Sequence, residues 1–289
     1  MIRSRGCAGL TAFAVAATAA QAQEGDTVEE PLWEVGVGAF AVNAPDYPAS
    51  GNRSTNGLPV PIVIYRGDIL RVGEDDAVRV VPVEDDLFEL SLSAGASFPA
   101  SSDGNPVREG MPDLDFLFEL GPELIVHGPT VMTESRGSGA LELALQVRAV
   151  LSVDFEDGDF EQRGYVFEPE LRYRHRGLLG EGTAFSASIG PIFATEELHD
   201  YFYEVGPRFA TADRPAFDAE GGYLGTRAGA GLSFDLTDRF TLFGGVGVGV
   251  YSGAANRDST LFEEDVTASV FAGFTYTFYK SARTVTRPR

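Results

Sequence analysis

A strict alternation of apolar with small or polar residues near the end of the chain is the strongest constraint on its fold. In the stretch VTASVFAGFTYTFYK, residues 266–280, every second residue from Val266 to Phe278 is apolar. Successive side chains of a β-strand point to opposite faces, so this period gathers the apolar residues on one face. The segment therefore predicts a strand with one face in an apolar environment and the other beside small and polar groups.

The same period recurs along most of the chain, between polar, acidic or glycine-rich segments. Gly, Pro and β-branched residues interrupt every candidate helix, and no stretch offers the 18 or so consecutive apolar residues of a membrane-spanning helix. The sequence therefore predicts an all-β fold without a helix. The further strands are expected at 33–42, 58–66, 87–98, 113–126, 139–153, 164–175, 183–195, 222–236 and 239–252, with two weaker ones at 68–73 and 77–83.

Strand length favours a membrane barrel over a soluble β-sandwich. Several strands reach about a dozen residues, enough for the roughly 9 to 11 that a tilted strand needs to cross a bilayer, whereas soluble strands average about 5 or 6. The apolar faces end in aromatic residues such as Phe88, Tyr173 and Phe278, as at the two interfaces of a membrane. Hydrocarbon requires every backbone amide to be paired, which means closure. We predict a transmembrane antiparallel up-and-down β-barrel of twelve strands, with ten as the alternative.

The first residues of the chain predict export. Arg3 and Arg5 precede an apolar run, and Ala20-Gln21-Ala22 supplies the small residues of a cleavage site, so residues 1–22 are expected to be a signal peptide removed after Ala22. The single Cys7 would leave with it, which takes away any disulfide or thiolate metal site. The expected location is the outer membrane of a Gram-negative bacterium.

The loops define the expected orientation and domain organisation. Bacterial barrels have short periplasmic turns and long outer loops, which places the long loop 196–221 outside and, in the periplasm, both the start of the first strand and the end of the last strand. We expect an N-terminal periplasmic segment at 23–32, the barrel at 33–278 and a basic periplasmic tail at 279–289.

The net charge limits the partners. Without Arg3 and Arg5, the 22 basic residues fall to 20 against 43 acidic ones, a net charge of −23. Nucleic acid needs a basic surface and is therefore not an expected partner. Outer-membrane lipid, lipopolysaccharide and the barrel assembly machinery are the expected ones.

Five segments carry a resemblance to a known family. The chain resembles the MipA/OmpV family of outer-membrane proteins, which includes the MltA-interacting protein, a scaffold for murein-hydrolysing complexes. The resemblance implies a scaffold or interaction role, with a periplasmic murein hydrolase as a partner. Two positions depart from the family pattern, Thr260 where proline is expected and Phe240 where tryptophan is frequent. The segments are Pro45-Asp46-Tyr47 with Ser50, LPVPIVIYRGD at 58–68, HDYFYEVGPRFATADRPAFDAEGG at 199–222, LTDRFTLFGGVGVG at 236–249 and FTYTF at 274–278.

Three groups of residues are candidates for interaction. The long loop is rich in aromatics and arginine, which dominate binding hot spots; it is either a lid or contact surface, or a self-packed plug. The last strand resembles the signal read by the assembly machinery, and the tail is either a contact for an anionic partner or a loose extension. The residues are Asp200, Tyr201, Phe202, Tyr203, Arg214, Pro215 and Phe217 in the loop, Phe274, Tyr276 and Phe278 in the strand, and Lys280, Arg283, Arg287 and Arg289 in the tail.

No motif indicates catalysis, a metal or a cofactor. His127, His175 and His199 are the only histidines, and none belongs to a G-x-S-x-G or H-E-x-x-H motif. The acidic run 154–159 lacks the full pattern of a calcium loop, which favours a solvated outer loop. We expect a protein that is not an enzyme and has no cofactor; a lipid-modifying barrel enzyme is one rival, tested by replacing His175 and His199.

Charged residues on the polar faces of the strands leave a second rival open. They either select permeating ions, which would make the protein a narrow cation-favouring channel, or pair across strands and fill the lumen. These residues are Glu119, Glu123, Glu142, Arg148, Glu168, Glu170, Arg172, Arg174 and Arg227.

Overall fold

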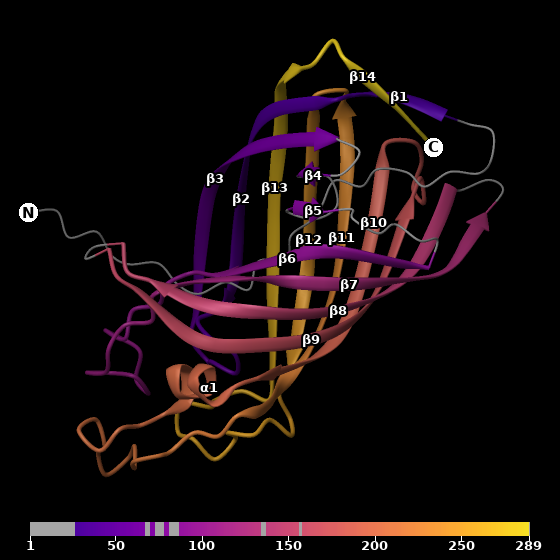
Figure 1. Cartoon of the computed structure of the whole chain (residues 1–289). Helices are drawn as coiled ribbons and strands as arrows, with labels where there is room; N and C mark the ends of the chain where they lie inside the picture. Colours follow the sequence, from indigo (N-terminus) through magenta and orange to yellow (C-terminus); the bar gives the residue numbers. More distant parts are fainter. Residues whose placement is uncertain are drawn as a thin grey trace, which may run out of the picture.

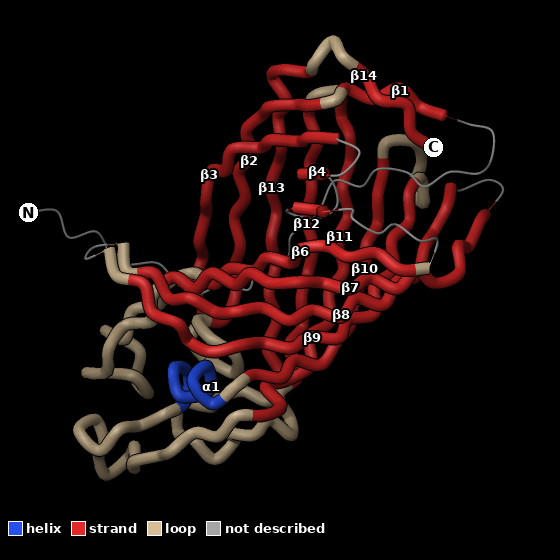
Figure 2. The backbone as a smooth tube through the Cα atoms, in the orientation of Figure 1, coloured by secondary structure: helices blue, strands red, loops and turns tan. Residues whose placement is uncertain are grey.

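The architecture comes from a computed structural model, which describes residues 27–66, 70–72, 78–80, 87–133, 137–155 and 158–288. The expected signal peptide 1–22 and parts of the weak strands expected at 68–73 and 77–83 lie outside the described residues. Within them, antiparallel strands form one strongly curled sheet (Figures 1 and 2). The prediction of a fold built from antiparallel β-strands is confirmed.

Ten long strands build the curled sheet, and each contains or overlaps a segment with the expected alternation. Neighbours in the sheet are neighbours in sequence, except that the last long strand pairs with the first and so brings the two ends of the chain together. The strands are β2 (Trp33–Pro45), β3 (Arg53–Arg66), β6 (Phe88–Ser97), β7 (Phe116–Thr133), β8 (Gly137–Val153), β9 (Phe160–Arg176), β10 (Thr183–Ala194), β11 (Gly222–Thr237), β12 (Phe240–Val250) and β13 (Val266–Lys280).

The sheet has its shortest strands where the alternation of apolar and polar residues in the sequence is weakest. The two weak segments contain the three-residue strands β4 (Leu70–Val72) and β5 (Val78–Val80). β4 pairs with β3 and β5, but β5 meets β6 at the single pair Val78 and Leu92. Ten strands are therefore long and extensively paired, and the count of twelve depends on this short pair.

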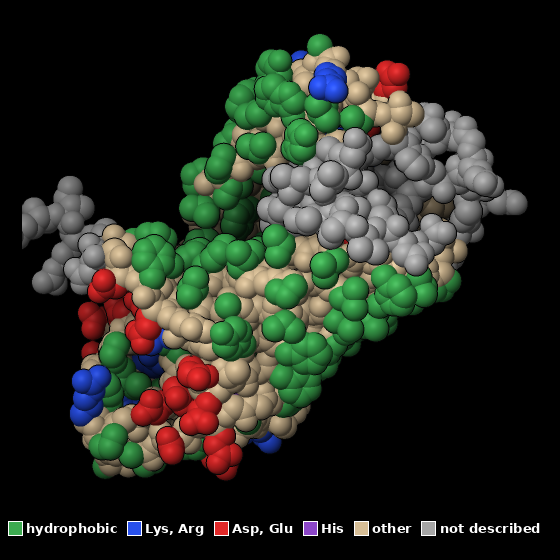
Figure 3. Space-filling view, viewed as in Figure 1, with side chains coloured by type: hydrophobic (Ala, Val, Ile, Leu, Met, Phe, Trp, Pro, Cys, Tyr) green, Lys and Arg blue, Asp and Glu red, His purple; other side chains and the backbone are tan. Residues whose placement is uncertain are grey.

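The apolar faces of the strands point outward. In β13, Val266, Val270 and Phe274 are exposed while Thr267 and Phe271 between them are buried. Figure 3 shows hydrophobic side chains spread over the outer surface of the curled sheet, while acidic side chains gather at one end. Such a surface belongs in lipid, because exposed apolar patches of this extent are rare on soluble monomers. Among the described residues, no helix is both long enough and apolar enough to span a membrane.

The strands expected at 113–126 and 139–153 are too short, since a longer connection between them was expected than the structure has. β7 continues to Thr133 and pairs with Gly137 at the start of β8, with a register shift between His127 and Thr130. Gly128 and Pro129 break the alternation at this point. The shift absorbs both residues as a bulge and lets the ladder go on.

A short helix, α1 (Glu196–Tyr203), corrects the expectation of a chain without helices. It buries Leu198, His199, Phe202 and Tyr203, a spacing that puts these side chains on one helical face. Glu196 and Glu197 lie in its first turn, where the helix dipole favours negative charge. Eight residues within a long loop gave too short a pattern to be recognised against the strands.

The two terminal segments form a small sheet of their own, so the tail is not a loose extension. β1 (Thr27–Pro31) pairs antiparallel with β14 (Thr284–Pro288), at the end of the molecule opposite α1 (Figure 1). An ion pair fixes this sheet to the barrel, because Arg66 of β3 lies 3.1 Å from Glu30 of β1. Arg66 also lies 2.8 Å from Glu34 of β2, and Lys280 of β13 lies 3.2 Å from the same Glu34. Each segment is too short to predict alone, and the pairing depends on the two chain ends meeting.

Candidate functional site

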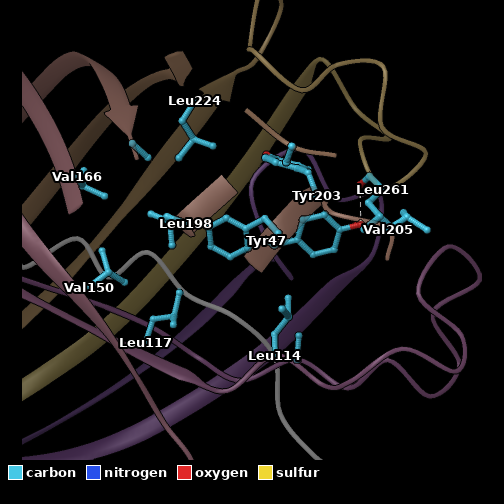
Figure 4. Packing of buried hydrophobic residues seen from close by; sticks show 14 residues of the cluster. Tyr47, Leu114, Leu117, Val150, Val166, Leu198, Tyr203, Val205, Leu224 and Leu261 are labelled. Atoms are coloured by element: carbon cyan, nitrogen blue, oxygen red, sulfur yellow. Dashed lines mark hydrogen bonds between the residues drawn. The ribbon is translucent and has the colours of Figure 1, made fainter. Parts of the chain in front are cut away.

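Four loops at one end of the curled sheet pack into a single structure, which we call the loop cap: residues 46–52, 98–115, 195–221 and 251–265. A buried apolar cluster holds them against the ends of the barrel strands (Figure 4). The cap side chains include Tyr47, Leu114, Leu198, Phe202, Tyr203, Val205 and Leu261, and the strand side chains include Leu117, Val150, Val166 and Leu224.

Hydrogen bonds to backbone carbonyls join three of the cap loops. The hydroxyl of Tyr47 donates to the carbonyl oxygen of Leu261 at 2.7 Å, and that of Tyr203 donates to the carbonyl oxygen of Pro48 at 2.8 Å. Ser259 donates to the carbonyl oxygen of Tyr203 at 2.7 Å. Tyr203 is completely buried, so it ties three loops together from the centre of the cap.

The structure brings part of the predicted interaction loop into this cluster and leaves part outside. Phe202 and Tyr203 are buried, and the hydroxyl of Tyr201 accepts a 2.6 Å hydrogen bond from the backbone N–H of Asp115. Arg214 donates to the carbonyl oxygens of Val107 and Glu109 at 2.9 and 3.1 Å, and Phe217 pairs with Val205. Asp200 is half-buried and Pro215 is exposed. The aromatic side chains therefore face the molecule rather than solvent.

Sequence reasoning missed several cap residues from the other loops. Arg108 is buried and donates 3.3 Å hydrogen bonds to the carbonyl oxygen of Phe202 and to the hydroxyl of Ser102. Asn256 is also buried, lies 2.8 Å from Nδ1 of His199 and donates to the carbonyl oxygen of Glu220. Isolated polar residues in loops carry no period, so only the fold could identify their partners.

Burial shifts the protonation of two neighbouring groups in the cap. The pKa of Asp200 is raised to about 6, by burial first and then by the carboxylates of Glu204 and Glu196. Its Oδ1 atom is buried without a hydrogen-bond partner among the described residues. The pKa of His199 is lowered by burial, which keeps the imidazole neutral beside Asn256. Neutral forms of both side chains therefore fit the cap best.

Behind the cap, ion pairs run along the inner face of the curled sheet, from β7 to β11. Arg148 lies 2.8 Å from Glu119 and 2.6 Å from Glu168, and Arg227 lies 2.6 Å from the same Glu168. Glu168 and Arg148 are almost fully buried. Four residues from four strands thus form one chain of alternating charge, which we call the inner ion-pair chain.

The remaining predicted lumen charges are paired in the same way. Arg172 lies 2.7 Å from Glu123 and 2.6 Å from Glu170, and Arg174 lies 3.2 Å from Glu142. Of the two alternatives given for these charges, the structure shows pairing across strands for Arg172 with Glu123 and for Arg174 with Glu142. Because each cation sits against a carboxylate, little of this charge is available to attract a permeating ion.

A cavity separates the cap from the inner ion-pair chain. Leu198, Phe202 and Tyr47 line its cap side, and Arg148 and Arg227 line the opposite side. Its empty volume is about 1050 Å³, the part open to solvent included. The cavity therefore has these large apolar and aromatic side chains on its cap side and charged but paired side chains on the opposite side.

The described residues contain no group of three or more His, Cys, Asp or Glu side chains that could hold a metal ion. The histidines lie apart: His127 is within 3.4 Å of Glu89, His175 within 2.7 Å of the hydroxyl of Tyr173, and His199 beside Asn256. Residues 156 and 157 of the acidic run lie outside the described residues. That the protein has neither cofactor nor catalytic centre stays a prediction.

The residues expected in the closing strand and tail lie at the end opposite the cap. Phe274, Tyr276 and Phe278 are exposed on the outward face of β13. Lys280 ends β13 beside Glu34, Arg283 is exposed just before β14, Arg287 lies within β14, and Arg289 lies outside the described residues. None of the described residues of this set lies near the cap.

A sheet curled into barrel form, apolar on its outer side, charged within and capped at one end defines an outer-membrane protein of the β-barrel class. The chain belongs to the MltA-interacting protein MipA family, whose model matches residues 35–278. No curated protein matches the sequence.

Several solved structures resemble this fold at low identity. An outer membrane channel from Pseudomonas putida F1 is 12% identical, with 89% of this chain and 100% of that chain covered and a TM-score of 0.47. The NanC porin is 10% identical over 84% and 98% of the two chains, with a TM-score of 0.34. OmpT of Vibrio cholerae is 9% identical over 89% and 100%, with a TM-score of 0.35. All three TM-scores lie below 0.5.

Proposed function

We propose that this protein is an occluded twelve-strand outer-membrane barrel that acts as a scaffold for murein-hydrolysing enzymes in the periplasm. The observation that carries the proposal is that the loop cap covers one end of the barrel. The inner ion-pair chain of Glu119, Arg148, Glu168 and Arg227 runs along the inner wall behind it, where its charges compensate one another. A barrel closed at one end in this way is suited to holding its ends in place rather than to passing solutes.

Closure into twelve strands is supported by the strand order. β9 pairs with β10, and β5 reaches β6 at Val78 and Leu92, so each described barrel strand has a neighbour on both sides. An open edge in hydrocarbon would leave backbone amides unpaired, each at several kcal/mol. Closure satisfies this requirement, whereas a ten-strand sheet ending at β3 and β6 would have two edges to cover.

The orientation follows from the connections. The short turn between β11 and β12 lies at the end that carries β1 and β14, and the long loops form the cap at the other end. Bacterial barrels place short turns in the periplasm and long loops outside. The β1–β14 sheet would thus face the cell wall, and the acidic cap would face lipopolysaccharide.

Each expected partner would meet a different part of the protein: its outer face, its last strand or its periplasmic end. Outer-membrane lipid would cover the apolar outer face, and the assembly machinery would read the last strand through Phe274, Tyr276 and Phe278. The matched family is described as MltA-interacting, which supports a murein hydrolase as the periplasmic partner.

Two measurements on the full mature chain test the scaffold role. The detergent-solubilised protein should retain a murein hydrolase from a periplasmic extract, and a variant that lacks residues 284–289 should retain much less. A variant that lacks residues 207–213 of the cap is the matched control and should retain as much as the wild type. In planar bilayers the protein should be silent. A conducting protein that retains no hydrolase would refute the scaffold.

A narrow channel is the second candidate, and the cavity beneath the cap favours it. In this case the cap residues Phe202 and Tyr203 would form the gate over a space of about 1050 Å³, its open part included. Replacing both residues by alanine should then produce single-channel currents that the wild type shows only when the cap opens. Currents that favour cations over anions would fit the acidic loops.

A further inference from the structure

The sheet of β1 and β14 has a definite inner ladder, which fixes the direction of its backbone groups. The backbone N–H of Leu32 donates to the carbonyl oxygen of Arg283 at 2.7 Å, in the same register as the five pairs of β1 and β14. Opposite residues of an antiparallel ladder alternate between hydrogen-bonded and non-hydrogen-bonded pairs. Glu30 and Val285 therefore bond each other, and their neighbours turn their backbone groups away from the partner strand.

On β14, the residues that turn outward are Thr284 and Thr286. Both are exposed, and β14 pairs with β1 alone among the described strands. Their N–H and carbonyl groups form the beginning of a second ladder, on which none of the described strands lies. Such an edge is the usual template for the addition of a strand from another chain.

The outer edge of β1 is less suited to accept a strand. Its outward residues include Pro31, which has no N–H and whose carbonyl oxygen accepts a 2.9 Å hydrogen bond from Arg66. Glu29 adds an exposed carboxylate on this side. Proline and charge are two of the devices that keep strand edges from pairing. The small sheet therefore has one blocked edge and one accessible edge.

Charge indicates what the accessible edge would take. The tail 279–289 contains Lys280, Arg283, Arg287 and Arg289 and no acidic residue. The strand that β14 already holds has the sequence TVEEP, with two glutamates. A second strand of the same acidic character would meet the same basic segment from the other side.

We propose that the outer edge of β14 binds an extended acidic segment of a periplasmic protein, which adds a third strand to the β1–β14 sheet. This inference rests on the proposed scaffold role and names how the scaffold would hold its partner. Backbone hydrogen bonds to Thr284 and Thr286 supply the pairing, and Arg283 supplies the preference for an acidic strand.

The test uses the full mature chain in detergent micelles and a labelled synthetic peptide, Thr-Val-Glu-Val-Glu-Thr, followed by fluorescence anisotropy. An otherwise identical peptide with lysine in place of glutamate is the charge control. The acidic peptide should bind at least tenfold more tightly than the lysine peptide. Arg283→Glu should reduce this preference, because it reverses a charge without changing the backbone edge.

Proline substitutions separate the two edges. Thr286→Pro removes an outward N–H and leaves the bonds to β1 in place, so it should weaken peptide binding about tenfold, the equivalent of one or two hydrogen bonds. Glu29→Pro makes the same change on the outer edge of β1 and should leave binding within twofold of the wild type. Equal effects of the two variants, or equal binding of the two peptides, would overturn the proposal.

A second copy of this chain is the competing occupant. A protein that is dimeric in micelles and becomes monomeric on Thr286→Pro would assign the edge to self-association and overturn the acidic-strand proposal. The edge site and the scaffold role fail on different results. If the wild type and Thr286→Pro retain the hydrolase equally, the edge site is refuted and the scaffold role is not. If the protein conducts and retains no hydrolase, the scaffold role itself is refuted.

Discussion

The hydroxyl of Tyr203 donates a 2.8 Å hydrogen bond to the carbonyl oxygen of Pro48, a residue 155 positions away in the sequence. This bond connects α1 with the loop after β2, and the carbonyl oxygen of Tyr203 is in turn held by Ser259. The cap is therefore one cooperative unit built around a single buried tyrosine, and its opening requires these bonds to break together.

Removing the Tyr203 hydroxyl should loosen the cap. Tyr203→Phe keeps the ring in the cluster but leaves the carbonyl oxygen of Pro48 without its donor, a loss of about 1–2 kcal/mol. Protease cleavage within residues 206–218 should become several times faster. Tyr276→Phe, on the outward face of β13, is the control and should leave the cleavage rate unchanged. Equal rates for all three proteins would contradict a role of this bond in the cap.

Removing the central cation of the inner ion-pair chain should destabilise the barrel. Arg148→Met leaves the carboxylates of Glu119 and Glu168 buried without their partner, and the loss of one member of a buried pair lowers stability by about 3–5 kcal/mol. Urea unfolding in lipid vesicles measures this change. Arg257→Met breaks a pair with Asp265 in which both side chains are about half exposed, so its effect should stay below about 1 kcal/mol.

The stability of the cap should depend on pH through Asp200. Its pKa rises from an ordinary value of 3.8 to about 6 on folding, so the folded cap binds the proton more tightly than the unfolded chain does. This contribution is fully present below pH 4 and is lost as the pH rises through about 6. His199, with its lowered pKa, acts in the opposite direction.

Asp200→Asn isolates this effect, because His199 is common to both proteins. The variant should have a more stable cap than the wild type at pH 7, and the difference should shrink as the pH falls to 4. Hydrogen exchange of the α1 amides at both pH values measures it. A difference that is constant with pH would show that the carboxylate does not titrate in this range.

A charge on the outward face should prevent stable insertion. Val270 is exposed near the middle of β13, and a lysine at the bilayer midplane destabilises a barrel by about 2–4 kcal/mol. Val270→Lys should therefore reduce the free energy of unfolding in lipid vesicles by this amount. Thr284→Lys, in the sheet outside the barrel, should change it by less than about 0.5 kcal/mol. A small effect at Val270 would argue against lipid contact at this face.

Much of the barrel could be predicted because its signal is local. The alternation from Val266 to Phe278 needs no knowledge of other strands, since a pleated strand sends neighbouring side chains to opposite faces whatever its partner. The pairing of Arg148 with Glu119 could also be expected, because opposite charges on neighbouring strands leave few other partners in a closed interior. The bulge at His127 to Thr130 was missed because Gly128 and Pro129 resemble the residues of a turn.

The alternation of the strands, the charged interior and the apolar exterior can be read from the amino-acid order alone, because each follows from residue type and a period of two. The packing of α1 under the other loops, the bond from Tyr203 to Pro48 and the pairing of β14 with β1 become visible only in the folded chain. These contacts join segments between 155 and more than 250 residues apart. No local pattern encodes such contacts, since their free energy is gained only after the long strands have brought the loops and the chain ends together.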